Sequence, residues 1–287
     1  MASKPTHTPP QKTWLSASFK SGSTSTVKPK HGGVMLDAQT QANVRANLLS
    51  AARPALRPQD KLFSKPATAP TGVGLESGRV RDRMIQRIAA QGMTHPAVLE
   101  AMSRVDRHKF VDSALVNQAY EDTSLPIGLG QTISKPSVVA RMLALLLEHT
   151  PAPLGRVLEV GSGCGYQAAV LSFIAREVYS MERLKGLHDK ARANLRGMQR
   201  PNIHLLFGDG FLGYPAGGPY AAIISAAGGE SVPQTWIDQL AVGGRLIAPT
   251  HTPGGQQSLV VIDKTATGLA KQVLEPVLFV PLKSGVA

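Results

Sequence analysis

Cysteine is almost absent from this sequence, since Cys164 is the single one among 287 residues. One cysteine excludes an internal disulfide framework and fits a reducing compartment. Long apolar runs are missing as well: no stretch of 18 or more apolar residues occurs, and none near the start could form the core of a signal peptide. The sequence therefore predicts a cytoplasmic protein that makes no use of a membrane.

Metal-ligand spacings are also lacking. Cys164 has no Cys or His companion at a spacing typical of zinc sites, and the histidines fall at predicted helix ends or within strands. We therefore expect no metal site.

Acidic residues are scarce in residues 1–75. This segment holds ten of the 31 Lys and Arg but two of the 19 Asp and Glu, so it carries +8 of the net charge of +12. Its Ser-, Thr- and Pro-rich composition without sustained periodicity predicts a disordered basic extension, with a transient helix over residues 37–52. A contact of this extension with nucleic acid, membrane phosphates or an acidic partner stays an alternative. The remaining residues carry +4, which argues against a basic nucleic-acid groove on the folded part.

Residues 76–287 form the predicted folded domain. Apolar residues at helical spacing predict a first helix from Val80 that stops at Gly92, and two later helices have Pro96 and Pro136 near their starts. Between these two helices, residues 122–134 hold one Pro and two Gly with little periodicity, which predicts a shaped loop.

Strands alternate with helices from Arg156 onward. This alternation implies parallel crossover units and one sheet covered on both faces. Two final strands are joined by a segment too short for a helix, so they form an antiparallel hairpin. The predicted fold is α/β, a doubly wound, mostly parallel seven-stranded sheet with a C-terminal antiparallel hairpin, preceded by N-terminal helices. The expected strands are residues 157–160, 177–182, 203–207, 220–225, 244–249, 258–263 and 272–280.

Three features follow three consecutive strands and meet at one edge of this sheet. The first is a glycine loop, Gly161-Ser162-Gly163-Cys164-Gly165, which lets backbone approach a ligand at a helix N-terminus. The second is Glu182, placed to accept hydrogen bonds from ribose hydroxyls, and the third is Asp209, placed to accept one from an adenine amino group. An ordinary surface glutamate and an ordinary turn aspartate are the alternatives for the two acids. Together the three features favour an adenosine cofactor.

Glycine spacing helps to decide which adenosine cofactor this is. A dinucleotide-binding loop needs a third glycine where this chain has Tyr166, and no Gly-x-x-x-x-Gly-Lys-Ser/Thr sequence occurs. The antiparallel final hairpin also points away from a dinucleotide fold. The residues therefore favour neither NAD nor a P-loop nucleotide.

Several segments resemble the class I S-adenosylmethionine methyltransferases, and within them the protein-L-isoaspartate O-methyltransferase family. The most specific is Leu-Pro-Ile-Gly-Leu-Gly-Gln-Thr-Ile-Ser-Lys-Pro, within residues 122–142. The others are residues 157–171, Gly208-Asp209-Gly210, residues 243–246 and residues 279–282. The resemblance spans about Arg79 to residue 287. It implies methyl transfer from S-adenosyl-L-methionine to the free carboxylate of L-isoaspartyl residues in damaged proteins and peptides, which initiates their repair.

The resemblance also implies roles for single residues. Ser134 corresponds to the catalytic-site serine, and an alternative role for it is the N-cap of the helix that follows. Residues matching the substrate site are Thr132, Ile133 and Val280. Residues matching the cofactor site are Glu159, Gly161, Glu182, Asp209 and Gly210, and we expect Ser162, Gly163 and Gly165 of the glycine loop to bind the cofactor with them.

The chain departs from the family pattern at Lys135, Ala221 and Gly229. The last two bear on the loop after the fourth strand and leave its fit to a substrate open. Two other functions are kept as alternatives: a methyltransferase of the same fold acting on RNA or a small molecule, and a non-catalytic binding protein. We expect a monomer.

Overall fold

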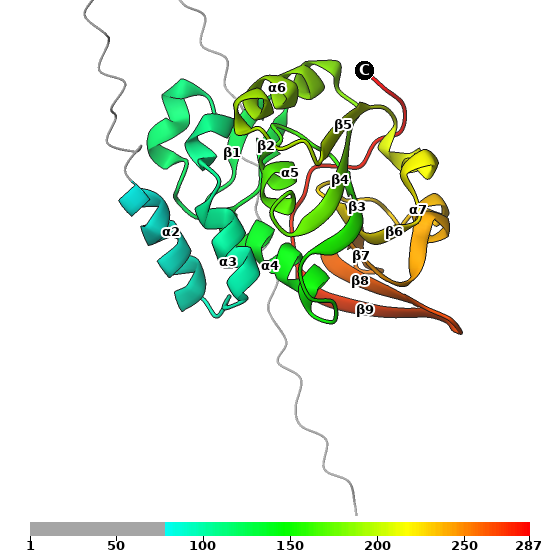
Figure 1. The fold of residues 1–287 in the computed structure, drawn as a ribbon. Coiled ribbons are helices and arrows are strands. Elements are labelled where there is room, and N and C mark those ends of the chain that lie inside the picture. The colour runs from blue at the N-terminus through cyan, green and yellow to red at the C-terminus, as the bar shows by residue number, and fades with distance from the viewer. Residues whose placement is uncertain (1–77) are drawn as a thin grey trace, which may run out of the picture. The chain divides into compact units, whose positions relative to one another are not determined.

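Three helices and a short hairpin precede the sheet in the computed structural model, which describes residues 78–287 (Figure 1). All described residues belong to one compact unit. The predicted disordered extension over residues 1–75 and the transient helix over residues 37–52 lie outside the described residues.

The predicted N-terminal helices are present as α2 (Gly78–Ala90), α3 (Pro96–Ser103) and α4 (Pro136–Leu147). Proline lies in the first turn of α3 and of α4, where its missing N–H has no partner to lose. The apolar faces of the three helices pack into one core cluster.

Residues 122–134, predicted as a loop, contain an antiparallel hairpin. Strands β1 (Leu125–Gly128) and β2 (Gln131–Ile133) pair across a turn in which Gly128, Leu129 and Gly130 all have positive φ, at 98°, 52° and 68°. The loop prediction was wrong because strands of three and four residues are too short for a two-residue period to be recognised.

The main sheet has seven strands in the order β5-β4-β3-β6-β7-β8-β9. The predicted number of strands and the mostly parallel arrangement are confirmed. The pairs among β5, β4, β3, β6 and β7 are parallel, and β8 pairs antiparallel with both β7 and β9. The strands are β3 (Leu154–Val160), β4 (Ala175–Glu182), β5 (Ile203–Phe207), β6 (Tyr220–Ser225), β7 (Leu240–His251), β8 (Gln257–Thr265) and β9 (Gly268–Pro276).

Helices cover both faces of this sheet (Figure 1). Neighbouring side chains of β3 show the division, since Val157 packs with the cluster that includes α2 to α5 and Leu158 packs on the other face against Trp236. The helices that follow the first strands are α5 (Tyr166–Leu171), α6 (Lys185–Leu195) and α7 (Gln234–Gln239). Burial on both faces explains why the central strands are almost continuously apolar.

Several boundaries differ from the sequence prediction. Strand β7 covers Leu240–His251 and not 244–249, and β9 covers Gly268–Pro276 and not 272–280, because the turn of the final hairpin lies at residues 266–267. Strands β3 and β8 also extend beyond their predicted limits. The helix expected to run through Ala175 ends at Leu171, and Ala175 already begins β4. Residues of this segment are buried on all sides, so their apolar run carries no helical period that would mark its end. Helix α7 was not predicted.

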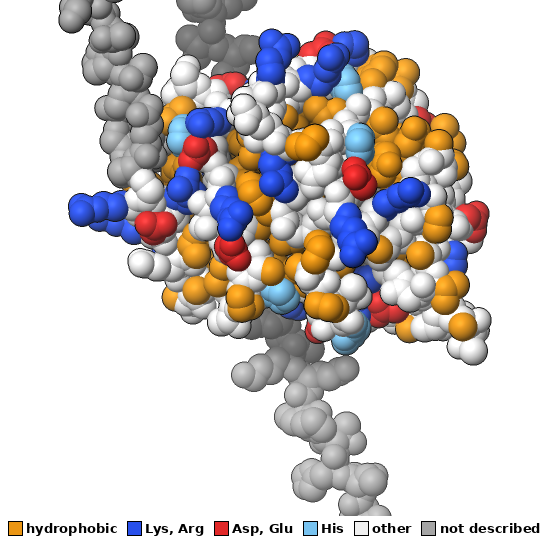
Figure 2. Space-filling view, in the orientation of Figure 1, with side chains coloured by type: hydrophobic (Ala, Val, Ile, Leu, Met, Phe, Trp, Pro, Cys, Tyr) orange, Lys and Arg blue, Asp and Glu red, His pale blue; other side chains and the backbone are white. Residues whose placement is uncertain are grey.

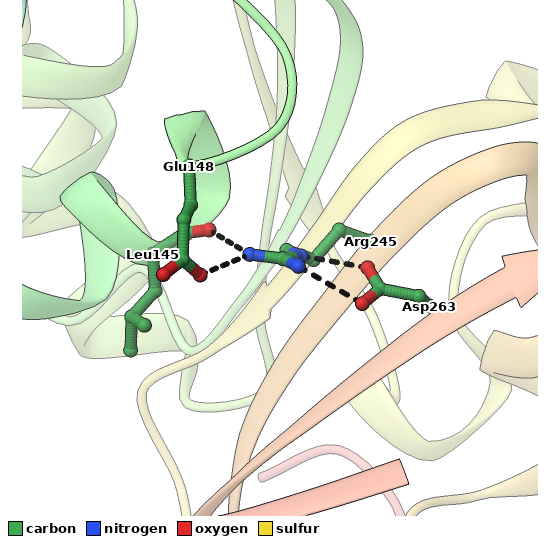
Figure 3. A network of polar contacts seen from close by, with 4 residues as sticks. All are labelled: Leu145, Glu148, Arg245 and Asp263. Carbon is green, nitrogen blue, oxygen red and sulfur yellow. Dashed lines mark hydrogen bonds and ion pairs between the residues drawn. The ribbon is translucent and has the colours of Figure 1, made fainter. Parts of the chain in front are cut away.

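One polar network joins the end of α4 to the β7–β8 pair (Figure 3). The Arg245 guanidinium donates to both carboxylate oxygens of Asp263, at 2.6 and 2.9 Å, and also to Glu148 Oε2 and Leu145 O, at 2.7 and 2.8 Å. The Arg245 side chain is 8% exposed. These contacts fix a helix against the sheet on the side away from the strand ends that carry the cofactor motifs.

The surface drawn in Figure 2 carries basic side chains dispersed among acidic and apolar ones. In residues 78–287, no helix is long and apolar enough to cross a membrane.

Candidate active site

A cavity of about 450 Å³ opens at the carboxyl ends of β3 and β4. Its walls come from the β1–β2 hairpin, the loop after β3, the residues that lead into α6, and residues 280–283. Strand β3 pairs with β4 on one side and with β6 on the other, so the chain reverses direction across the sheet beside this loop. Ligands of open α/β sheets bind at such a switch point, and the volume suits a small-molecule ligand.

The glycine loop enters this cavity with left-handed backbone. Gly161, Gly163 and Gly165 have φ values of 91°, 54° and 89°. A Cβ on Gly163 would lie 3.1 Å from Ile127 Cδ1, and one on Gly165 would lie 3.0 Å from Leu195 Cδ1. Gly161, Ser162 and Gly163 line the cavity, whereas Gly165 is the N-cap of α5 and lies behind them. At Gly161 and Gly163 the loop therefore presents main chain to the cavity.

Glu182 lies on the cavity wall at the end of β4 with 5% of its surface exposed. Its Oε2 accepts a hydrogen bond from Gly163 N at 2.9 Å, and its Oε1 accepts one from Leu184 N at 3.0 Å. Each carboxylate oxygen can accept a second bond. The carboxylate is therefore held in one orientation and keeps acceptor capacity for a pair of hydroxyl groups.

Glu159 is fully buried near the end of β3 and does not line the cavity. Its Oε2 accepts a hydrogen bond from Ser180 Oγ, which lies 2.6 Å from Ser162 Oγ in the loop. Burial, the largest influence, raises the pKa of Glu159 to about 8. This residue is thus placed to support the glycine loop through two serines.

Asp209 follows β5, and its carboxylate is engaged by main chain. It accepts hydrogen bonds from Phe211 N at 2.9 Å and from Gly285 N at 2.6 Å. The neighbouring Gly210 lines the cavity, and a Cβ there would lie 2.6 Å from Val160 Cγ1. The Asp209-Gly210 pair thus joins the last residues of the chain to the cavity floor.

Ser134 lines the same cavity as the glycine loop and directly follows β2. It does not cap α4: the N-cap is Lys135, and no side-chain cap bond is present there. Asp122 takes that part instead, because its carboxylate accepts from Ser137 N at 2.9 Å and from Ser137 Oγ at 2.8 Å. Among residues 78–287, no partner engages the Ser134 hydroxyl, so it is available to a ligand.

The three predicted substrate residues also line this cavity. Thr132 is exposed and Ile133 is buried in the hairpin, and Val280 comes from the segment after β9. Gly228 N donates to Val280 O at 2.8 Å, and Leu282 N donates to Gly228 O at 2.7 Å. The loop after β6 and the end of the chain therefore form one wall together.

The departures from the family pattern in this loop are accommodated by packing. A Cβ on Gly228 would lie 2.6 Å from Gln257 Nε2, and one on Gly229 would lie 3.1 Å from Ser231 O. At the start of β6, Ala221 faces Gly155, where a Cβ would lie 3.1 Å from that of Ala221. Small residues at these places allow the neighbouring segments to approach closely.

Sequence reasoning missed two residues of this region. Tyr166, noted only as the place of an absent glycine, is buried and lines the cavity. Arg107 lies behind it, and its Nη2 donates to Ser134 O at 2.7 Å. No spacing in the sequence marks this arginine, which belongs to a single-turn helix, η2 (Arg107–Phe110).

Among the described residues, no group of three His, Cys, Asp or Glu could hold a metal ion.

Comparison with known proteins identifies the family. The sequence model of protein-L-isoaspartate(D-aspartate) O-methyltransferase matches residues 79–287. The chain belongs to this family. It is 57% identical to the protein-L-isoaspartate O-methyltransferase of Methylibium petroleiphilum, with 82% of this chain and 91% of the relative aligned. The enzyme of that name from Leptothrix cholodnii is 52% identical, over 90% of this chain and 95% of the relative.

Solved structures of the family share the fold. A beta-aspartate methyltransferase from Plasmodium falciparum, crystallised with S-adenosyl-L-homocysteine, superimposes with a TM-score of 0.63 and 26% identity, covering 71% of this chain and 98% of the other. A second protein-L-isoaspartate O-methyltransferase gives a TM-score of 0.65 and 26% identity, covering 72% of this chain and 67% of the other. The predicted family and the class I methyltransferase fold are thereby confirmed.

Proposed function

We propose that this chain transfers the methyl group of S-adenosyl-L-methionine to the free carboxylate of L-isoaspartyl residues in damaged proteins and peptides, and so initiates their repair. The observation that carries the proposal is one cavity with two different walls. The glycine loop and Glu182 form one wall, and Ser134, whose hydroxyl is available to a ligand, forms the other.

The residues present fit the methyl donor. Left-handed glycines offer main chain where side chains would clash, and the Glu182 carboxylate is fixed by two N–H groups beside them. Bound S-adenosyl-L-methionine supplies a sulfonium methyl, which is an activated electrophile. In this proposal Glu182 accepts the ribose hydroxyls, Gly161, Ser162, Gly163 and Gly210 contact the cofactor, and Glu159, Gly165 and Asp209 hold these residues in place.

The chain's own residues have little acid–base chemistry to perform. A carboxylate is already ionised and nucleophilic at neutral pH, so the reaction needs orientation and exclusion of water more than a general base. Ser134 donates a hydrogen bond to one oxygen of the substrate carboxylate. The other oxygen is free to attack the sulfonium methyl, and S-adenosyl-L-homocysteine is the leaving group. Thr132, Ile133 and Val280 hold the peptide on either side. A hydroxyl suits this task because it orients the substrate without adding a charge.

The setting of the enzyme completes the proposal. We propose that it acts as a monomer in the cytoplasm, which its single, buried cysteine supports. Residues 1–75 are proposed to be a basic extension that is dispensable for methyl transfer. A nucleic-acid contact by that extension remains the alternative.

Transfer of a radiolabelled methyl group tests this function. The acceptors are a peptide with one L-isoaspartyl residue, its aspartyl twin of identical sequence, and bulk RNA. We expect incorporation into the isoaspartyl peptide alone. Incorporation into RNA would favour a nucleic-acid methyltransferase, and absence of transfer to every acceptor would favour a binding protein.

A further inference from the structure

Arg107 is completely buried behind the Ser134 side of the cavity. Its Nε donates to Ala119 O and its Nη2 donates to Ser134 O, both at 2.7 Å. Its guanidinium carbon lies 4.7 Å from the centre of the Tyr166 ring, within the range of a cation–π contact. One side chain thus contacts three separate segments of the chain.

The relative position of these three segments determines where Ser134 lies with respect to the glycine loop. Ala119 lies six residues before the β1–β2 hairpin and Ser134 directly follows it, so the guanidinium connects the segments that lead into and out of the hairpin. Tyr166 is the first residue of α5, directly after the glycine loop. Arg107 therefore connects the wall that carries Ser134 with the helix that continues the cofactor loop.

An arginine that only filled space at this buried position would lower the stability of the fold, because its charge is removed from water. Among residues 78–287, no carboxylate forms an ion pair with Arg107, although Asp122 is near enough to favour its charged form, and Arg107 Nη1 has no hydrogen-bond partner. Burial of a cation with so few partners is strongly unfavourable. A guanidinium differs from other donors in that its planar fork directs hydrogen bonds to two places at fixed angles. That geometry matches two carbonyls, one in the segment before the β1–β2 hairpin and one directly after it.

We infer that Arg107 is a positioning residue for methyl transfer, which holds Ser134 at its working distance from the glycine loop. The inference rests on the proposed function for the role of Ser134. A displacement of about 1 Å at a reacting group can lower a rate on the order of a hundredfold. A loosened Ser134 should thus affect turnover more than cofactor binding.

The chain offers a matched control in Arg200. Its guanidinium also donates to a main-chain carbonyl, that of Ser172, and lies 4.1 Å from the centre of the Phe173 ring. Neither Ser172 nor Phe173 lines the cavity. Arg107→Lys and Arg200→Lys therefore both remove a guanidinium bond to a main-chain carbonyl and a contact with an aromatic ring. Arg107 is completely buried beside Ser134, and Arg200 is partly buried and remote from it.

The test compares kcat, the KM for an isoaspartyl peptide, and the Kd for S-adenosyl-L-homocysteine from calorimetry. We expect Arg107→Lys to lower kcat at least tenfold, with KM and Kd changed by less than about threefold, and Arg200→Lys to leave all three near wild type. Equal losses of kcat in both variants, or an unchanged kcat in Arg107→Lys, would overturn the inference. If Arg107→Lys does not fold, Arg107→Gln, which keeps one amide donor, replaces it with the same expectation.

Amide hydrogen exchange separates this inference from the proposed function. Exchange at residues 131–134 should accelerate in Arg107→Lys and not in Arg200→Lys, whatever the substrate proves to be. Unaltered exchange there would refute the positioning role. Absence of transfer to isoaspartyl peptide by the wild-type chain would refute the proposed function instead.

Discussion

Replacing Glu159 by Gln should remove a pH dependence from the stability of this fold. The folded state raises the pKa of Glu159 from its ordinary 4.5 to about 8 because the carboxyl is completely buried. The fold therefore prefers the protonated form, whose stabilising contribution is full below about pH 4.5 and is lost as the pH rises through about 8. Glutamine has nearly the same shape and no proton to lose.

The magnitude follows from the size of the shift. Each pKa unit corresponds to about 1.4 kcal/mol, so the unfolding free energy of the wild type should fall relative to Glu159→Gln by up to that amount per pH unit between about 5 and 8. Above pH 8 the difference should level off. Other groups titrate equally in both proteins, so they cancel when the two are compared.

Urea unfolding followed by far-UV circular dichroism measures this difference at a series of pH values. The expected result is a variant whose advantage over the wild type grows from pH 5.5 to pH 8. A difference that stays constant with pH would refute the reasoning, because it would mean that Glu159 is ionised in the folded protein.

Three further predictions concern other parts of the chain. Gly210→Ala should destabilise the fold by about 1–3 kcal/mol in urea unfolding and weaken binding of S-adenosyl-L-homocysteine, because its Cβ would lie 2.6 Å from Val160 Cγ1; adding Val160→Ala should restore part of the stability. Arg245→Met should lower the unfolding free energy by about 2–4 kcal/mol, since it leaves Asp263 without its bidentate partner, yet kcat should stay near wild type. Deletion of residues 1–75 should leave kcat and KM for an isoaspartyl peptide unchanged, and a loss of activity would assign that segment a part in catalysis.

Much of the fold could be predicted because the sequence patterns are strong where elements are long or bounded by clear signals. Strands β5 and β6 agree with their predicted limits, and α4 begins at the predicted proline. The hairpin at residues 125–133 could not be predicted, since its strands are very short and its turn places Leu129, a residue other than glycine, in the left-handed region.

The sequence predicted which segments line the cavity better than it predicted the hydrogen bonds that their side chains form. Strand-end logic correctly brings the glycine loop and Glu182 to one cavity wall, because carboxyl ends of parallel strands meet at one edge. The same logic cannot distinguish Glu182 from Glu159, because both carboxylates occupy the carboxyl-terminal parts of adjacent strands. In the structure Glu182 lines the cavity, whereas Glu159 is buried behind the glycine loop and is connected to it through the hydroxyls of Ser180 and Ser162. Nor could it find Arg107, whose partners are main-chain carbonyls that carry no sequence signal.

In the proposed methyl transfer, Ser134 orients the substrate carboxylate within the cavity that the cofactor loop also lines. Single-turnover methyl transfer by Ser134→Ala, measured with calorimetric titration of S-adenosyl-L-homocysteine, tests it most directly. We predict a rate for the isoaspartyl peptide lowered on the order of a hundredfold, with the Kd for S-adenosyl-L-homocysteine within about threefold of wild type. A single-turnover rate equal to that of the wild type would contradict the account.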